Sequence, residues 1–364
     1  MGYKISEADS KMEIKDFLKA KVPEVEKEIE KYIPRKASKE WIEQALGKTV
    51  FELDLEAYTK GVNAPIWDLL DRGGKRFRPV MTCIVSEAVG GKWEDGMKLS
   101  PMVELIHNGT LMSDDVEDDS VARRGKPCVH KIFGVDTAVN TGAIMYFWPL
   151  MKIKNNEFKL SEEKRNAIYD LYVTEMVRVS SGQAWDIEWH HGGYTPNEKQ
   201  YLNMCLCKTG VLTKFACQLG AIAGGASKKQ YEALGEFGQI VGVGFQIQDD
   251  ILELTETSFK EKKGSIGGDI HEGKRTLIVI RTFEKANPKD KKRLVEILDS
   301  HTTDEKVIQE ALDIINKYDG IKYAKSVADK MVENAWAKIN KALPESNAKA
   351  LLKKFAEHLV ERKI

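Results

Sequence analysis

Residues 98–119 read KLSPMVELIHNGTLMSDDVEDD and join an apolar helical stripe to a dense acidic end. Apolar residues recur with the spacing of an amphipathic α-helix. The stripe consists of Met102, Leu105, Ile106, Gly109, Met112 and Val116. Asp114 and Asp118 are one helical turn apart, so a helix places them on one face, about 6 Å apart along its axis. The stretch therefore predicts a central helix that carries carboxylates near its C-terminal end.

A second stretch, residues 238–254, has the same two features. Its apolar stripe consists of Ile240, Val243, Ile247, Ile251 and Leu254, and its polar face carries Gln246, Asp249, Asp250 and Glu253. Carboxylates that crowd one helix face repel one another and lose hydration. Either cluster alone could be an exposed acidic surface that pairs with lysines, because 31% of the residues are charged. Two such clusters, each within an apolar helix, favour a site for divalent cations.

Cations follow both acidic clusters in the sequence. Arg123-Arg124-Gly125 follows the first cluster, and Lys274-Arg275 follows the second. Basic side chains beside metal ligands indicate that the bound ligand is itself strongly negative, such as a diphosphate. Magnesium suits this arrangement best, since it keeps several waters and binds through few carboxylates plus substrate phosphates. The alternative for Arg123-Arg124-Gly125 is a cationic helix end that is terminated by glycine.

A third basic stretch, residues 71–79, reads DRGGKRFRP and precedes an apolar segment. Glycines let the backbone approach a phosphate closely, and arginine can bind phosphate through two parallel hydrogen bonds. The alternative is a helix end whose cations interact with the helix dipole, followed by a new helix at Pro79. Residues 208–210 (KTG) and 272–276 (EGKRT) are weak signals individually. Together with the acidic helices, these stretches predict a pocket for two polyanions, one bound through metals and one through cations.

Most of the remaining sequence also reads as helical, and alternating strand patterns are lacking. Residues 1–45 are rich in Lys and Glu, and their apolar residues have the spacing of an amphipathic helix: Ile14, Leu18, Val22, Val25 and Ile29. We expect loops at residues 152–163, 190–197 and 257–269, where Gly, Pro or charged residues cluster. The sequence predicts one large all-α domain over residues 46–364, with residues 1–45 as a charged helical segment packed on it.

Composition excludes several classes of protein. The chain has 364 residues, of which 42% are hydrophobic, and its 56 basic and 56 acidic residues give a formal net charge of zero. This balance gives no reason to expect a nucleic-acid partner. No apolar run approaches the ~20 residues of a membrane span, so we expect no stable membrane anchor. The five cysteines show neither zinc spacing nor a disulfide framework, and we expect a cytoplasmic protein with reduced thiols.

Seven motifs in a fixed order resemble those of the trans-isoprenyl diphosphate synthases, especially the geranylgeranyl diphosphate synthases. The motifs are GGKRFRP (73–79), ELIHN (104–108), DDVED (114–118) with RRG (123–125), GQAWD (182–186), KTG (208–210), GFQIQDD (244–250) and GDIHEGK (268–274). The resemblance implies an isoprenoid synthase type fold, a helical bundle around a deep central cavity. It also implies a homodimer.

The resemblance assigns roles to individual residues of these motifs. The residues implied to hold the diphosphate of isopentenyl diphosphate are Lys75, Arg78 and His107, with Arg124 assisting. Those implied to contact the allylic diphosphate are Arg123, Lys208 and Lys274. Thr209 and Gln246 would lie near the reacting carbons, and Gln183 and Asp186 would line the pocket. The implied magnesium ligands are Asp114, Asp118 and Asp249, supported by Asp115 and Asp250.

Two positions depart from the pattern of the family. Glu253 stands where many members have Asp, which keeps the charge but lengthens the side chain by one methylene. Gly264 replaces the lysine that usually precedes the Gly-Asp-Ile motif, and Lys262 or Lys263 could substitute for it.

The implied reaction is a magnesium-dependent condensation, with three ions per site. The allylic diphosphate ionises, the double bond of isopentenyl diphosphate attacks the allylic cation, and a proton leaves. A terpene cyclase would need an Asn/Asp–Ser/Thr–Glu triad on the second helix, which residues 249–253 do not form. A non-catalytic regulatory subunit would be expected to lose one acidic motif, and this chain keeps both.

Small residues before the first acidic motif predict the length of the product. Short-product members carry aromatics four or five residues before the first Asp, whereas this chain has Thr110 and Gly109. We expect the growing chain to pass this point and to stop at Ile106 or at a plug formed by Met145, Tyr146, Phe147 and Trp148. Alternatively, these aromatics only pack the core or a dimer contact. A C20 product, geranylgeranyl diphosphate, is expected, with farnesyl or longer (C25 and above) products as alternatives.

Overall fold

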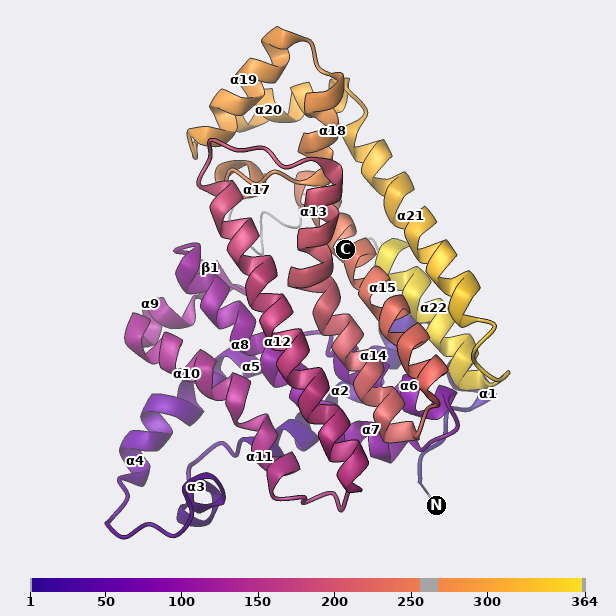
Figure 1. Cartoon of the computed structure of the whole chain (residues 1–364). Coiled ribbons are helices and arrows are strands. Elements are labelled where there is room, and N and C mark those ends of the chain that lie inside the picture. Colours follow the sequence, from indigo (N-terminus) through magenta and orange to yellow (C-terminus); the bar gives the residue numbers. More distant parts are fainter. Residues whose placement is uncertain (1, 256–267, 362–364) are drawn as a thin grey trace. The chain divides into compact units, whose positions relative to one another are not determined.

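The computed structural model describes residues 2–255 and 268–361 of the chain (Figure 1). Within these ranges the regular elements are helices, apart from one antiparallel hairpin of β1 (Ala122–Arg123) and β2 (Lys126–Pro127). The all-α prediction is therefore confirmed. The predicted loop at 257–269 lies largely outside the described residues, as do Lys262, Lys263 and Gly264.

The helices have the following bounds. In chain order they are α1 (Glu7–Lys11), α2 (Ile14–Tyr32), α3 (Lys39–Leu46), α4 (Leu55–Tyr58), η1 (Thr59–Asn63), α5 (Ala64–Asp71), α6 (Phe77–Ala88), α7 (Trp93–Leu99), α8 (Pro101–Glu117), α9 (Val129–Phe133), α10 (Val135–Phe147), α11 (Pro149–Lys154), α12 (Glu162–His190), α13 (Glu198–Cys205), η2 (Leu206–Gly210), α14 (Val211–Gly224), α15 (Lys228–Thr255), α17 (Gly268–His271), α18 (Leu277–Lys285), α19 (Pro288–Asp299), α20 (Glu305–Lys317), α21 (Gly320–Ile339) and α22 (Asn347–Glu361). The two η elements are π-helical turns.

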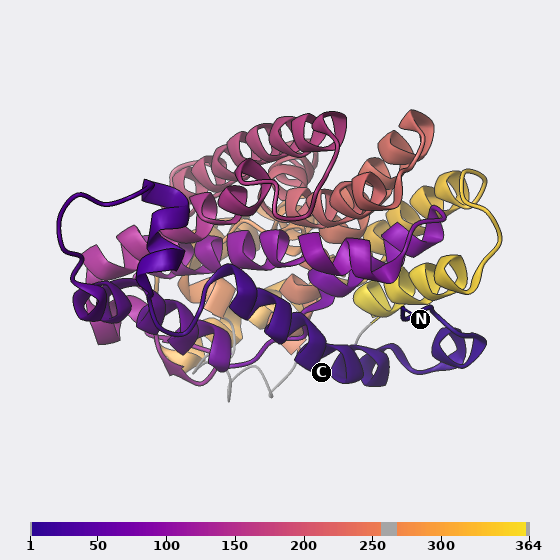
Figure 2. The same cartoon turned by 90° about the horizontal axis from the view of Figure 1, so that it is seen from below.

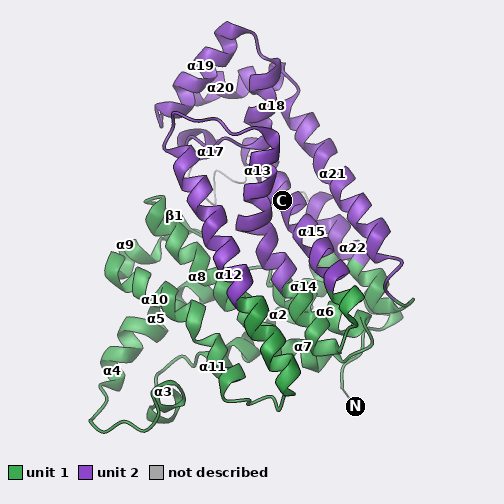
Figure 3. Cartoon of the chain, viewed as in Figure 1, with its two compact units in different colours: residues 1–172, 216–231, 344–352 green, residues 173–215, 232–343, 353–364 purple. Residues whose placement is uncertain are grey.

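The chain divides into two compact units, which are coloured separately in Figure 3. Unit 1 consists of Met1–Tyr172, Ala216–Tyr231 and Pro344–Leu352. Unit 2 consists of Val173–Phe215, Glu232–Leu343 and Lys353–Ile364. The predicted boundary between residues 45 and 46 lies inside unit 1, and that division of the chain stays a prediction. The first acidic motif belongs to unit 1 and the second to unit 2, so their predicted meeting also stays a prediction.

In unit 1, helix α8 buries the stripe that its sequence indicates. Met102, Leu105, Ile106, Gly109 and Met112 are all buried, whereas Val116, the last residue of the predicted stripe, is partly exposed. Helix α2 contacts α6, α7 and α8 through its own apolar side. That side consists of Ile14, Phe17, Leu18, Val25, Ile29 and Tyr32. The apolar spacing of both helices thus identifies the faces that form the core of this unit.

In unit 2, helix α15 packs closely against the C-terminal helices. A Cβ atom added at Gly244 would lie 2.9 Å from Val332 of α21 and 3.1 Å from Val360 of α22. Figures 1 and 2 both show the yellow helices α21 and α22 side by side, and Lys325 Nζ donates to the carbonyl oxygen of Val360 at 3.1 Å. The glycine therefore lets α15 approach both helices at the level of the second acidic motif.

Three further glycines bring α12, η2 and α15 together within unit 2. A Cβ at Gly182 would lie 2.3 Å from the backbone nitrogen of Lys208, and one at Gly210 would lie 2.7 Å from the carbonyl oxygen of Gln239. A Cβ at Gly242 would lie 2.7 Å from the Cα of Gly210. Since any side chain would separate these backbones, the glycines fix the positions of the residues around them.

One alternative and one expectation for local structure prove wrong. Helix α8 ends at Glu117, and Arg124-Gly125 forms the turn of the β1–β2 hairpin, so Arg123–Gly125 is not a helix end. Both turn residues have positive φ angles, 53° at Arg124 and 76° at Gly125, as in the tight turns that join two strands. The loop expected at 152–163 is shorter than predicted, because α11 continues to Lys154.

Two further findings hold for residues 2–255 and 268–361. No helix found there combines the length and the apolar character that crossing a bilayer requires. All five cysteines are free thiols, and only Cys207 is not fully buried.

Candidate active site

The glycine-rich stretch between α5 and α6 in unit 1 forms a tight loop. Gly73 and Gly74 have φ angles of 84° and 149°, which disfavour residues with a side chain. Arg76 also has a left-handed backbone, with φ at 47°, immediately before α6 begins at Phe77. Lys75 is exposed in this loop, whereas Arg78 is buried on the first turn of α6. The loop thus presents two of the predicted phosphate ligands in different environments.

Arg76 anchors the loop to α8 through a buried ion pair. Its Nη1 donates to Glu104 Oε1 at 2.8 Å, and its Nη2 donates to the carbonyl oxygen of Leu70 at 2.7 Å. Asn108 Nδ2 donates to the same Glu104 oxygen at 3.0 Å. The side chains of Arg76 and Glu104 are 1% and 4% exposed. A guanidinium group therefore links the end of α5, the loop and the helix that carries His107 and the first acidic motif.

Arg124 holds the other side of the same loop. Its Nη1 donates to the carbonyl oxygens of Gly73 at 2.5 Å and Leu69 at 3.3 Å. A Cβ at Gly74 would lie 3.1 Å from Arg76 Nη1 and 3.4 Å from Arg124 Nη2, so a glycine is needed between the two guanidinium groups. Burial lowers the pKa of Arg124 to about 10, and the positive charges of Arg76 and Arg123 add to the shift. An anionic ligand at this point would relieve that repulsion.

His107 lies on α8 among these cations. Loss of hydration lowers its pKa well below the usual value, and the guanidinium groups of Arg78 and Arg124 lower it further. His107 is therefore uncharged at neutral pH, with one ring N–H available as a hydrogen-bond donor. The structure thus brings together Arg78, His107 and Arg124, three of the four residues predicted to bind isopentenyl diphosphate.

The acidic end of α8 is paired with Arg123 of β1. Arg123 Nε donates to Asp115 Oδ1 at 2.8 Å, and its Nη2 lies 3.6 Å from Asp114 Oδ2. Burial would lower the pKa of Arg123, but the charges of Asp115 and Asp114 outweigh this effect and raise it above its ordinary value. Asp115 is buried, whereas Asp114 and Asp118 are partly exposed. Asp114 and Asp118, the two predicted principal metal ligands in this motif, are thus more accessible than Asp115.

The predicted chain-length residues lie at the contact between α8 and α10. A Cβ at Gly109 would lie 2.9 Å from Tyr146 Cε1 and 3.1 Å from the carbonyl oxygen of Gly142, so this glycine permits close helix packing. Thr110 Oγ1 donates to the carbonyl oxygen of His107 at 2.8 Å. The remaining members are Ile106 and Met145 (both buried), Tyr146 (Oη 3.0 Å from Ser113 Oγ), Phe147 (exposed) and Trp148 (its ring tilted by 32° against that of Trp41). Their role in limiting the product stays a prediction.

This packing changes what a substitution at Gly109 would report. We expect Gly109→Ala to lower the free energy of unfolding by about 1–3 kcal/mol, because a methyl group there overlaps Tyr146 and α10 must shift. Denaturant titration would measure the loss. Gly61→Ala is a matched control, since a Cβ at that π-helical glycine meets nothing within 4 Å. Equal stability of the Gly109→Ala protein and the unsubstituted chain would contradict the tight packing.

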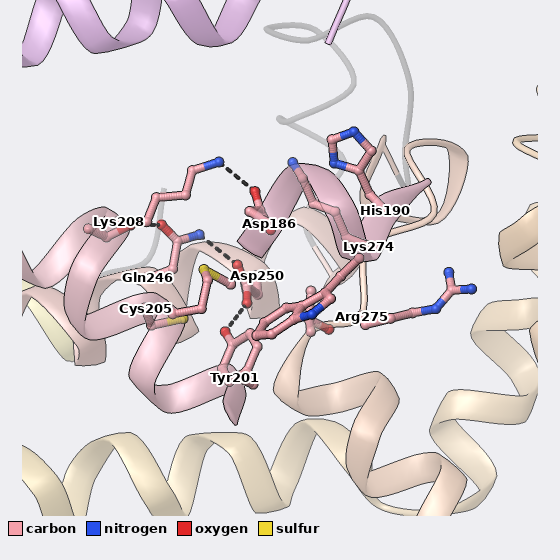
Figure 4. A pocket seen from close by; sticks show the side chains of 13 residues that line it. Asp186, His190, Tyr201, Cys205, Lys208, Gln246, Asp250, Lys274 and Arg275 are labelled. Carbon is pink, nitrogen blue, oxygen red and sulfur yellow. Dashed lines mark hydrogen bonds and ion pairs between the residues drawn. The ribbon is translucent and has the colours of Figure 1, made fainter. Parts of the chain in front are cut away.

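Unit 2 contains a pocket lined by residues from five segments (Figure 4). It encloses about 490 Å³ of space free of atoms, part of which is open to solvent. The lining residues are Asp186, Trp189, His190, Tyr201, Met204, Cys205, Lys208, Thr209, Gln246, Asp250, Lys274, Arg275 and Thr276. The pocket therefore gathers five predicted site residues with the predicted lining residue Asp186.

A chain of hydrogen bonds crosses the floor of this pocket. Tyr201 Oη donates to Asp250 Oδ2 at 2.6 Å, and Gln246 Nε2 donates to Asp250 Oδ1 at 2.8 Å. Thr209 Oγ1 donates to Gln246 Oε1 at 2.8 Å. Burial raises the pKa of the Asp250 carboxyl, although both donors favour its charged form. Both oxygens of Asp250 thus have donors from the protein.

Two lysines of the pocket are held by carboxylates. Lys208 Nζ lies 2.5 Å from Asp186 Oδ2. Lys274 pairs with Glu272 and lies 3.4 Å from Asp269 Oδ1. Burial would lower the pKa of Lys274, but these acidic neighbours raise it well above its usual value. Lys274 is therefore charged at neutral pH and suited to binding an anion.

Asp249 and Glu253 flank this network on α15. Asp249 is partly exposed, and Glu253 is buried where a Cβ at Gly268 would lie 2.5 Å from its Oε1. Throughout residues 2–255 and 268–361, no three or more His, Cys, Asp or Glu side chains gather in an arrangement that holds a metal ion. The donors offered are carboxylate oxygens, and magnesium needs few of them when it keeps water and phosphate ligands. The donor set therefore fits magnesium.

Sequence reasoning missed Tyr201 as a site residue. It precedes Lys208 by seven positions, about two helical turns, so both residues lie on one side of the α13–η2 segment. Lys208 and Thr209 sit in the π-helical turn η2, a local irregularity that frequently marks functional sites. The spacing of Tyr201 from the KTG motif was the available signal.

Comparison with known proteins agrees with this geometry. A family model described as polyprenyl synthetase matches residues 59–315. The short chain isoprenyl diphosphate synthase of Methanothermobacter thermautotrophicus is 36% identical over 296 residues, which cover 81% of this chain and 88% of that protein. The geranylgeranyl diphosphate synthase of Sulfolobus acidocaldarius is 31% identical over 298 residues, covering 82% and 89%.

A solved structure gives the same result for the fold. The crystal structure of geranylgeranyl pyrophosphate synthetase from Pyrococcus horikoshii matches with a TM-score of 0.83 and 31% identity. The match covers 96% of this chain and 99% of that one. The chain therefore belongs to the polyprenyl synthetase family and is a prenyltransferase.

Proposed function

We propose that this prenyltransferase condenses isopentenyl diphosphate with an allylic diphosphate and releases diphosphate. The substrates are dimethylallyl, geranyl or farnesyl diphosphate, and the main product is geranylgeranyl diphosphate. The observation that carries the proposal is the pocket of unit 2, which places Lys208 and Lys274 beside the Thr209–Gln246 pair. Such a pocket combines anion binding with neutral oxygen atoms, as the ionisation of an allylic diphosphate requires.

We assign the isopentenyl diphosphate subsite to the cations of unit 1. Lys75, Arg78 and His107 bind its diphosphate, and Arg124 assists by holding the glycine loop. The depressed pKa of His107 supports this assignment, because the guanidinium groups that an anion would neutralise add to the larger effect of burial. His107 then donates one N–H to a phosphate oxygen.

The allylic diphosphate is assigned to Lys208, Lys274 and Arg123. Asp114, Asp118 and Asp249 would hold its magnesium ions, three per site. Asp115 and Asp250 orient their neighbours, a role that fits their burial and their protein donors. The chemistry that bound magnesium supplies is neutralisation of the departing diphosphate.

The proposed reaction makes one carbon–carbon bond for each diphosphate released. The allylic C–O bond breaks, and its electron pair leaves with the diphosphate. The double bond of isopentenyl diphosphate attacks the allylic carbon, and a proton then passes from the new chain to the diphosphate. The lysines hold the anion in place.

We also propose a homodimer. Helix α10 exposes Val135, Val139 and Phe147, apolar side chains that a second copy of the chain would cover. Light scattering after gel filtration would then give twice the 41.1 kDa mass of the chain, whereas a particle of one chain mass would refute the dimer. The cytoplasmic location stays a prediction, supported by the free cysteines.

A primer series tests the proposed product. The purified protein is incubated with isopentenyl diphosphate, magnesium and a C5, C10 or C15 allylic primer, and the products are sized by chromatography. We expect a C20 product from each primer. A product that stops at C15 or continues to C25 and above would refute the assigned length.

Thr110→Phe should shorten the product, because Thr110 is the small residue four positions before Asp114.

A further inference from the structure

The hydrogen-bond chain in the pocket of unit 2 begins at a tyrosine that belongs to none of the recognised motifs. Tyr201 is 2% exposed, and its hydroxyl contacts Asp250 at 2.6 Å. Figure 4 shows its ring below Asp250, on the side opposite Lys208. The chain then runs from Asp250 to Gln246 and on to Thr209. Tyr201 thus reaches the reacting end of the pocket through two intervening side chains.

The chemistry of these groups fixes the direction of each hydrogen bond. An ionised carboxylate only accepts, so Asp250 requires a hydroxyl proton from Tyr201 and the amide nitrogen of Gln246. Gln246 must then turn its carbonyl oxygen toward Thr209, whose hydroxyl donates to it. The phenol of Tyr201 has a single proton, and the hydrogen bond directs it to Asp250.

This direction determines what Thr209 offers to a ligand. Because its proton points to Gln246, the lone pairs of Thr209 Oγ1 remain available to the pocket. A lone pair oriented in advance stabilises a developing positive charge without reorganisation. If Gln246 flipped its amide, the Thr209 hydroxyl would have to turn its proton elsewhere, and this orientation would be lost.

We propose that Tyr201 is a positioning residue that fixes Asp250, and through it Gln246, so that Thr209 presents its lone pairs to the allylic cation. The proposal rests on the proposed function, because the cation forms only in that reaction. Tyr201 itself touches no substrate in this account. Its effect is therefore confined to the chemical step and does not extend to the binding of either diphosphate.

Tyr201→Phe tests the proposal, since it removes only the hydroxyl group. We expect kcat to fall roughly 10- to 100-fold, as for other partners that orient a ligating or reacting group, while KM for both substrates is unchanged. The magnesium concentration for half-maximal rate should also stay the same. A rise in that concentration would mean that Asp250 acts through the metal and would overturn the proposal.

Tyr323→Phe is the matched control. Its hydroxyl donates to Glu198 Oε2 at 2.7 Å in the same unit, outside the pocket. The variant loses the same kind of bond, and its kcat should match that of the unsubstituted enzyme. Thermal unfolding without magnesium should show both variants folded. A loss of kcat in Tyr323→Phe as large as that in Tyr201→Phe would overturn the proposal.

A double-substitution cycle separates positioning from general damage. Thr209→Val removes the end of the chain, so Tyr201→Phe should have little further effect on kcat in that background. Effects that multiply would show that Tyr201 acts independently of Thr209 and would overturn the proposal. Gln246→Leu provides a second route if Tyr201→Phe fails to fold. It should lower kcat as strongly, and an unchanged rate would refute the proposal.

The unsubstituted enzyme in the same assay distinguishes this proposal from the proposed function. If it makes prenyl diphosphate and the Tyr201→Phe protein does so equally well, only the role of Tyr201 is refuted. If the unsubstituted enzyme makes none, the proposed function fails, and the role of Tyr201 fails with it.

Discussion

Asp114→Asn is expected to lower kcat by about 10²- to 10³-fold, the range found when one charge-stabilising group is removed from an active site. The substitution keeps the shape of the side chain but removes a negative charge from the accessible acidic face of α8. In the proposed function, that charge helps to bind the magnesium that accompanies the allylic diphosphate. Initial rates at saturating substrate, over a series of magnesium concentrations, measure the effect.

Asp119→Asn provides a matched control for the same change. Asp119 follows the same motif, but it is exposed and pairs with Lys131 at 2.5 Å. We expect the Asp119→Asn enzyme to keep its rate. Unfolding curves separate loss of function from loss of the contact between Asp114 and Arg123. A fully active Asp114→Asn enzyme, or equal losses in both variants, would contradict the role of Asp114.

Arg76→Met should cost about 3–5 kcal/mol of the free energy of unfolding, because it leaves Glu104 charged and buried. The remaining donor, Asn108 at 3.0 Å, carries no charge to compensate. The loop around Gly74 also loses one of its two anchors, so KM for isopentenyl diphosphate should rise. Denaturant titration and steady-state kinetics measure the two effects.

The paired variant Arg76→Met/Glu104→Leu distinguishes an unpaired charge from a packing defect. Removing both charges should recover much of the stability, as for other buried ion pairs that are replaced by apolar groups. Arg293→Met is the surface control, since Arg293 pairs with Glu310 where both side chains are exposed. It should cost far less. A similar loss in Arg76→Met and Arg293→Met would refute the buried pair as a source of stability.

The apolar periodicity of the sequence was sufficient to predict the helices around the site. In α8 the predicted stripe is buried except for Val116, and the acidic residues lie at the end of the helix. Periodicity reports which face of a helix is buried, but not which neighbour covers it. Gly109 shows this limit: its small size suggested open space, whereas α10 fills the position. The sequence alone does not show that α10, a later segment of the chain, packs against Gly109.

The hairpin and the tyrosine escaped prediction for different reasons. The turn at Arg124-Gly125 depends on positive φ angles, which the sequence RRG permits but does not require. Tyr201 lies outside the recognised motifs and gains its role only when α13 and α15 meet at Asp250. Asp115 and Asp250 illustrate the same point, since only the structure shows that both accept hydrogen bonds from protein donors.

The central claim, prenyl transfer at this site, is tested most directly by the stoichiometry of a single condensation. The purified enzyme is mixed with farnesyl diphosphate, labelled isopentenyl diphosphate and magnesium. Released diphosphate and labelled product are then measured together. The account predicts one diphosphate for each labelled C20 product, and neither without isopentenyl diphosphate. Diphosphate release without a lengthened product, or no turnover of either substrate, would contradict it.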